Sequence, residues 1–119
     1  MYKYIIPGRP VPKKTMTKNS KWSDPRAKQT LAYQQEIALR VKCRGWEGFT
    51  PDDDLILTVR VYLRNNVRGD LANYVKSCED GLQLSGLVPN DRQIVRYGEG
   101  TGIYRCDDER MEIEIGRLP

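Results

Sequence analysis

The sequence of 119 residues contains no histidine, only three cysteines and no long hydrophobic run. The absence of histidine excludes a histidine general base, every catalytic triad that depends on one and every zinc site with a histidine ligand. The cysteines, Cys43, Cys78 and Cys106, are odd in number and far apart, so they form neither a disulfide framework nor a C-x-x-C metal site. Any chemistry must therefore use carboxylates, lysines, thiols or a metal ion held by oxygen ligands.

The length and composition are those of one soluble globular domain. A chain of 119 residues with 39% hydrophobic and 30% charged residues can bury a core of its own but has no room for a second one. No apolar segment approaches the roughly 18 residues that a membrane-spanning helix needs. The first ten residues, MYKYIIPGRP, lack the apolar core and cleavage site of a secretory signal, so we expect a cytoplasmic protein.

The formal charge of +4 is distributed unevenly along the chain. Residues 1–44 contain eleven Lys or Arg and two acidic residues, a net charge of +9, whereas the remaining 75 residues have a net charge of −5. A basic N-terminal part suggests a polyanionic partner such as a nucleic acid. The acidic part contains the carboxylates that are the only plausible metal ligands.

Hydrophobic periodicity predicts a mixed α+β domain. Alternating apolar residues over 55–63 indicate a half-buried strand, while Asp24 and Asp70 are good N-caps for helices that Gly45 and Gly86 would end. The expected elements are strands at 2–6, 55–63, 93–99 and 111–115, helices at 25–44 and 70–85, and a basic loop at 8–23. We therefore predict a single compact domain of residues 1–119, with two helices packed on a mixed β-sheet in the order β-α-β-α-β-β.

Polar side chains at the second predicted helix are candidates for a site. Asn73, Lys76 and Asp80 share one helix face, and Asp70 and Asp91 could converge on one divalent cation. Each residue also has a purely structural interpretation. Asp70 can be a helix cap, Asp91 a turn residue, and Lys76 with Asp80 a solvated ion pair. Taken singly, none of them identifies an enzyme.

The segment from Arg68 to Tyr97, RGDLANYVKSCEDGLQLSGLVPNDRQIVRY, resembles the core of the RusA family of Holliday junction resolvases, found largely in phages and prophages. The family pattern is an Asp-x-Asp-Asn motif that opens a helix, a Lys and then an Asp on that helix, and a loop that ends in Asp-x-Gln. The matching residues are Asp70, Asn73, Lys76, Asp80, Asp91 and Gln93. The segment PGRPVPKK after the first strand is also similar to many members.

The resemblance implies a homodimeric, metal-dependent endonuclease that cuts four-way DNA junctions symmetrically, in the cytoplasm of a bacterial host. The family's metal-binding acids match Asp70 and Asp91, with Mg²⁺ as the expected ion and Mn²⁺ as an alternative, but the third acid is replaced by Ala72. Loss of one carboxylate should weaken Mg²⁺ binding, so we expect poor cleavage or none. The intact surroundings favour a deliberate inactivating substitution over a natural member that lost cleavage.

DNA affinity is expected from the basic N-terminal part. Lys76 is expected to stabilise charge on the phosphate or to orient the attacking water. The cations predicted to contact DNA phosphates are Arg9, Lys13, Lys14, Lys18, Lys21, Arg26 and Arg68. Two other functions remain open: a DNA-binding protein that occupies branched DNA without cutting it, which Ala72 favours, and an RNA-binding basic domain, which the placed acids disfavour.

Overall fold

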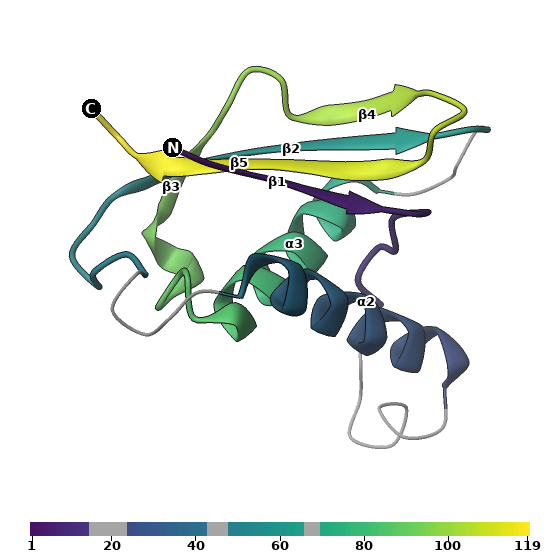
Figure 1. Ribbon diagram of the computed structural model, residues 1–119, viewed down its shortest axis with the longest axis horizontal. Helices are drawn as coiled ribbons and strands as arrows, with labels where there is room; N and C mark the ends of the chain where they lie inside the picture. The colour runs from purple at the N-terminus through teal and green to yellow at the C-terminus, as the bar shows by residue number, and fades with distance from the viewer. Residues whose placement is uncertain (15–23, 43–47, 66–69) are drawn as a thin grey trace.

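The computed structural model describes residues 1–14, 24–42, 48–65 and 70–119 (Figure 1). Along the chain the elements are strand β1 (Tyr2–Pro7), helix α2 (Pro25–Val41), strand β2 (Leu55–Leu63), helix α3 (Leu71–Ser85), the 3-10 helix η1 (Asp91–Gln93), and strands β3 (Ile94–Tyr97), β4 (Gly102–Arg105) and β5 (Arg110–Arg117). The predicted domain with two helices packed on a mixed sheet is confirmed. The predicted homodimer remains a prediction.

The strands form one mixed sheet in the order β1-β5-β2-β3, and β4 also pairs with β2. Strand β5 is antiparallel to both β1 and β2. Strands β3 and β4 run parallel to β2 and pair with its first and second halves, respectively. Strand β4 was absent from the predicted order, because its four residues are mostly exposed and show no alternation of buried and exposed positions.

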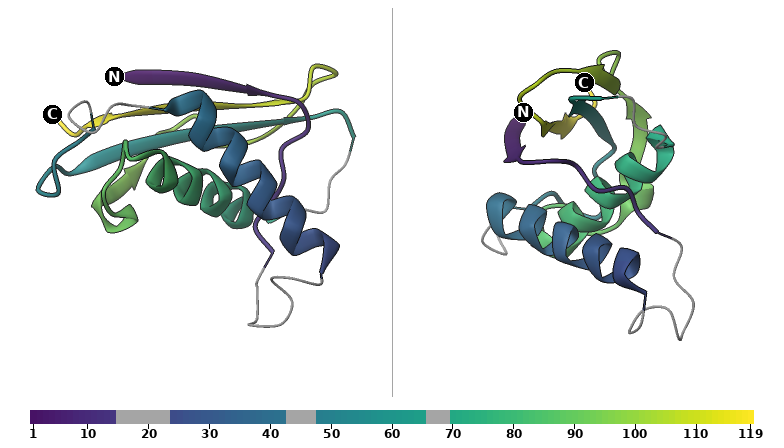
Figure 2. Two further views of the ribbon diagram at one scale, coloured as in Figure 1. Left: turned by 60° about the horizontal axis from the view of Figure 1, so that its bottom comes forward. Right: turned by 90° about the vertical axis from the view of Figure 1, so that its right-hand side faces the viewer.

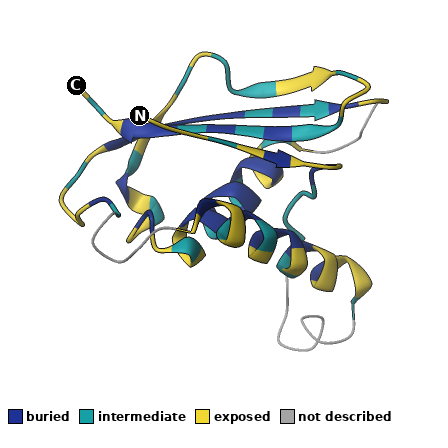
Figure 3. Cartoon of the chain, viewed as in Figure 1, coloured by how far each residue is buried: buried dark blue, intermediate teal, exposed yellow. Residues whose placement is uncertain are grey.

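Both helices cover the same face of the sheet, so the molecule has two layers (Figures 1 and 2). The core lies between these layers, and Figure 3 shows buried positions along β2, β5 and the inner sides of the helices. The predicted alternation in β2 is confirmed, since its five odd-numbered residues are at most 1% exposed. Side chains that fill the core with them are Ile6, Ile37, Tyr74, Cys78, Leu82, Met111, Ile113 and Ile115.

The helices begin where the sequence predicts them. The Asp24 side chain accepts a hydrogen bond from the Arg26 amide at the start of α2, and the described part of α2 ends at Val41 with Lys42 as its C-cap, three residues before the predicted end. Helix α3 has Asp70 as N-cap and ends at Gly86, which has a φ of +88°. Within the described residues, neither helix is long and apolar enough to cross a membrane.

Candidate functional site

The start of α3 carries three of the predicted site residues, Asp70, Ala72 and Asn73. The Asp70 carboxylate accepts a hydrogen bond of 3.1 Å from the Ala72 amide, so the capping role is confirmed. Asp70, Ala72 and Asn73 are all exposed, and no described residue donates a hydrogen bond to the second Asp70 oxygen. Ala72, where the sequence resemblance predicts the family's third acid, offers only a methyl group.

One turn further along α3, Lys76 contacts the 3-10 helix η1. Its ammonium lies 2.6 Å from the Asp91 carboxylate and 3.5 Å from that of Asp80. The hydrogen bond from Lys76 is the main cause that lowers the pKa of Asp91, and the same bond is the main cause that raises the pKa of Lys76, with smaller contributions from the charges of Asp80 and Glu79. The structure thus brings Lys76 and Asp91 together, as a charged pair at neutral pH.

Gln93 explains why Asp91 is held in place. Its side chain is buried and accepts a hydrogen bond from the Asn90 amide, while its own amide donates to the carbonyls of Thr50 at 2.7 Å and Asp53 at 3.0 Å. The Asn90 side chain completes a capping box at the start of η1. The sequence motif included Gln93 without a role. In the structure, the hydrogen bonds of its side chain connect η1 to the segment before β2.

A second polar network ties the basic N-terminal segment to both helices. The Lys13 amide donates to the Asn73 carbonyl at 2.9 Å, and the Lys13 ammonium lies 2.7 Å from the Asp80 carboxylate. Gln34 on α2 donates to the same carboxylate at 3.1 Å. Asp80 therefore joins α2, α3 and the N-terminal segment, a role that sequence reasoning missed, and the charge of Lys13 is engaged within the molecule.

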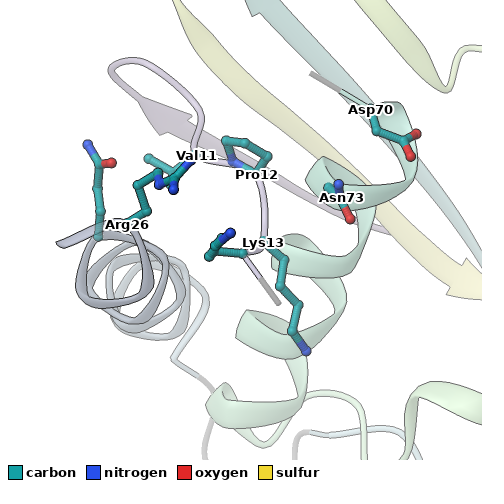
Figure 4. Close-up of a pocket in the computed structure, with 8 residues that line it drawn as sticks. Val11, Pro12, Lys13, Arg26, Asp70 and Asn73 are labelled. Atoms are coloured by element: carbon teal, nitrogen blue, oxygen red, sulfur yellow. The ribbon is translucent and has the colours of Figure 1, made fainter. Parts of the chain in front are cut away.

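Two other predicted DNA-binding cations lie at a pocket between the helix starts. Lys14 and Arg26 line this pocket together with Asp70 and Asn73. Figure 4 shows the segment from Val11 to Lys13 passing between α2, which carries Arg26, and α3, which carries Asn73. Lys14 and Arg26 are therefore close to the start of α3. Arg9, which is also predicted to contact DNA, forms an ion pair with Glu109 at 2.6 Å. The predictions for Lys18, Lys21 and Arg68 lie outside the described residues.

A separate pocket opens beside Ala72. Lys76, Glu79 and Tyr97 supply its polar side chains together with Thr101. Glu79 is only 8% exposed and accepts a hydrogen bond of 2.9 Å from the Tyr97 hydroxyl. Burial is the main cause that raises the pKa of Glu79. Sequence reasoning gave Glu79 no role, although its spacing of seven residues from Ala72 places it on the same face of α3.

Comparison with known families gives this geometry a context. The family model described as Endodeoxyribonuclease RusA matches residues 7–116, almost the whole chain. The chain belongs to the RusA endodeoxyribonuclease family. Membership in the RusA family implies a Holliday junction resolvase function. No curated protein matches the chain.

RusA-type resolvases generally depend on a divalent metal, and the donors of this chain suit one in their chemistry. Asp70 and Asp91 offer carboxylate oxygens, which are the ligands that Mg²⁺ prefers. Asp91 already holds a cation, the ammonium of Lys76. However, the described part of the chain has no three His, Cys, Asp or Glu side chains grouped closely enough to hold a metal ion. The oxygen donors therefore suit a divalent metal ion, but the described residues do not form a centre of three acids.

Proposed function

We propose that this RusA-family chain binds four-way DNA junctions as a homodimer and cleaves them slowly with a divalent metal. The observation that carries the proposal is the contact of 2.6 Å between Lys76 of α3 and Asp91 of η1, one helical turn beyond Ala72. This contact joins two motif residues that are 15 positions apart in the sequence. It lies in the N-terminal half of α3, and Asp70 is exposed at the start of the same helix. A four-way junction has two equivalent strands to cut, and a two-fold dimer matches that symmetry.

In this proposal Asp70 and Asp91 hold Mg²⁺, or Mn²⁺ in its place. When bound, the metal activates a water molecule and stabilises the leaving 3′ oxygen of the phosphodiester. Lys76 stabilises negative charge that develops on the phosphate. Because Ala72 removes one of three carboxylates, the metal binds weakly and cleavage is slow.

DNA phosphates are bound by the cations at the start of α2 and in the segment before it. Lys14 and Arg26 are the best-supported contacts, because they line a pocket that also contains Asp70. Lys18, Lys21 and Arg68 are predicted to extend this surface. Arg9 and Lys13 contribute less, since each already pairs with a carboxylate at 2.6 or 2.7 Å.

The competing function is a protein that binds branched DNA without cutting it. One observation favours it: Ala72 has only a methyl group at the predicted position of the third acid. We also expect a phage or prophage origin and action in the bacterial cytoplasm, as for the family in general.

Cleavage of a synthetic four-way junction by the chain and by an Ala72→Asp variant separates the two functions. With Mg²⁺ in excess, the proposal predicts slow cleavage by the parent chain and faster cleavage by the variant, with paired cuts in opposite strands. A variant that binds the junction but never cuts it would leave only the non-catalytic function.

A further inference from the structure

The pocket beside Ala72 has an apolar floor and an aromatic wall. The floor is one face of α3, to which Leu71, Ala72 and Val75 contribute at helical spacing. The wall is Tyr97 of β3, which is 50% exposed. The cavity of about 440 Å³ lies within the range of roughly 300–1,000 Å³ that is typical of ligand pockets, which are mostly apolar with a few convergent polar groups.

Two charged side chains of α3 complete the lining of the pocket. Glu79 is only 8% exposed, and the Tyr97 hydroxyl donates a hydrogen bond of 2.9 Å to one of its carboxylate oxygens. No described residue donates a hydrogen bond to the other oxygen. A carboxylate buried to this degree with one neutral donor destabilises a fold relative to an apolar side chain, which points to a ligand that supplies a further donor. Lys76 adds a partly exposed ammonium group to the same pocket.

Hydrogen bonds to β2 hold the wall of the pocket in place. The Gly98 amide, directly after Tyr97, donates to the Leu57 carbonyl at 2.9 Å. Thr101, which also lines the pocket, accepts a hydrogen bond of 3.2 Å from the Val59 amide. An aromatic ring that the sheet already fixes loses little conformational entropy when a planar ligand stacks on it.

A single unstacked nucleobase of the DNA matches these groups in shape and chemistry. Every base has a planar face that can stack on an exposed ring such as that of Tyr97. An ionised carboxylate is an acceptor only, so Glu79 favours a base with an exocyclic amino group, whereas the one N–H of thymine is flanked by two carbonyl oxygens. The Lys76 ammonium suits the phosphate that accompanies the base. Bases leave the stack most easily where pairing is already disturbed, as at a branch point.

We propose that the pocket between Tyr97, Glu79 and α3 holds one unstacked base from the branch point of the junction, and that it prefers a base with an exocyclic amino group. This inference rests on the proposed function and adds a base contact to the phosphate contacts of Lys14 and Arg26. Phosphate contacts position DNA without reading its sequence, whereas a base in this pocket makes binding depend on the sequence at the branch point.

Fluorescence anisotropy titrations in EDTA measure the affinities for a labelled four-way junction and for a duplex of the same sequences. Tyr97→Ala should weaken junction binding by at least about fivefold and leave duplex binding unchanged, because the stacking contact forms only with a base that has left the helix. The matched control is Tyr104→Ala on β4, which removes a similarly exposed tyrosine that stacks on Tyr62 on the face of the sheet opposite the helices. It should bind like the parent chain. Junction affinity of Tyr97→Ala equal to that of the parent overturns the inference.

The base preference distinguishes a ligand contact from a structural role. Among junctions that differ only in one base at the branch point, the parent chain should bind those with cytosine or adenine more tightly than the one with thymine. Glu79→Gln keeps the shape of the side chain, and its amide presents a donor to the pocket while its oxygen accepts from Tyr97. The preference should therefore shift towards thymine. A parent chain without preference, or an unchanged preference in Glu79→Gln, overturns the inference.

Circular dichroism should show that the variants are folded. Should Tyr97→Ala or Glu79→Gln not fold, Ala72→Leu replaces it, because position 72 is exposed and a larger side chain there narrows the pocket. Junction affinity of Ala72→Leu equal to that of the parent then overturns the inference.

Two other outcomes identify which proposal is wrong. If the parent chain does not bind the junction, the proposed function itself fails, whereas equal junction binding by parent and Tyr97→Ala leaves that function standing and rejects the base pocket. A second copy of the chain is the other conceivable occupant. If light scattering shows that Tyr97→Ala converts a dimer into a monomer, the pocket is a contact between subunits and the inference is overturned.

Discussion

Replacing Gln93 by alanine should destabilise the fold and release Asp91 from its position. The side chain makes three hydrogen bonds that would be lost, one from the Asn90 amide and two to the carbonyls of Thr50 and Asp53. A net value of about 1 kcal/mol for each bond gives a loss of roughly 3 kcal/mol. Thr50 is exposed and Asp53 is partly exposed, so water replaces some of the lost partners and we expect about 2 kcal/mol.

Urea denaturation followed by circular dichroism measures this loss, and a thermal scan should show a melting temperature lower by about 8 °C. Gln83→Ala is the matched control, because Gln83 is an exposed residue of α3 and takes no part in the hydrogen bonds that Gln93 makes. We expect the control to change the unfolding free energy by less than about 0.5 kcal/mol. If the two variants are equally stable, Gln93 does not anchor η1 and the explanation for the placement of Asp91 is wrong.

Three further changes test other parts of the account. Gly81→Ala should destabilise the fold by about 1 kcal/mol, because a Cβ would lie 2.7 Å from a side chain of α2, and chemical denaturation that shows a more stable variant would contradict this packing. Replacing Lys14 and Arg26 together by alanine should reduce the slope of log affinity against log salt by about 1.8 in junction-binding titrations, whereas Arg40→Ala should leave it unchanged. Asp91→Asn should lower the unfolding free energy at pH 7 by at most about 1 kcal/mol, because the lowered pKa of Asp91 stabilises the fold above its usual pKa of 3.8. This contribution is lost as the pH falls below 3.8 and through the folded pKa, so the difference between variant and parent should shrink with acidification. A difference that stays constant from pH 7 down through the acid range would refute this role.

Local patterns were sufficient to predict most of the elements. The strict alternation of β2 and the Asp and Gly residues that bound α3 are local signals. Strand β2 was confirmed at its predicted limits, and α3 was confirmed to within one residue, because Asp70 is its N-cap and not its first residue. Strand β4 lacked such a signal. It has only four residues at the edge of the sheet, and its pairing with β2 depends on residues about 40 positions away.

The candidate site could be predicted only in part, because its contacts are non-local. The motif predicted that Asp91 would lie near α3, yet its partner there is Lys76, 15 residues away. Lys13 was expected at the DNA surface, whereas it pairs with Asp80 across 67 residues of sequence. The sequence analysis gave Glu79 no role, and only the fold shows that the Tyr97 hydroxyl donates a hydrogen bond to it.

The affinity of the chain for a four-way junction, compared with a linear duplex of the same sequences, tests the central claim most directly. An electrophoretic mobility shift assay in EDTA, at one fixed salt concentration, measures both affinities without cleavage. The account predicts tighter binding to the junction, with the complex competed by unlabelled junction and poorly by duplex. Equal affinities for junction and duplex would contradict recognition of four-way DNA by this chain.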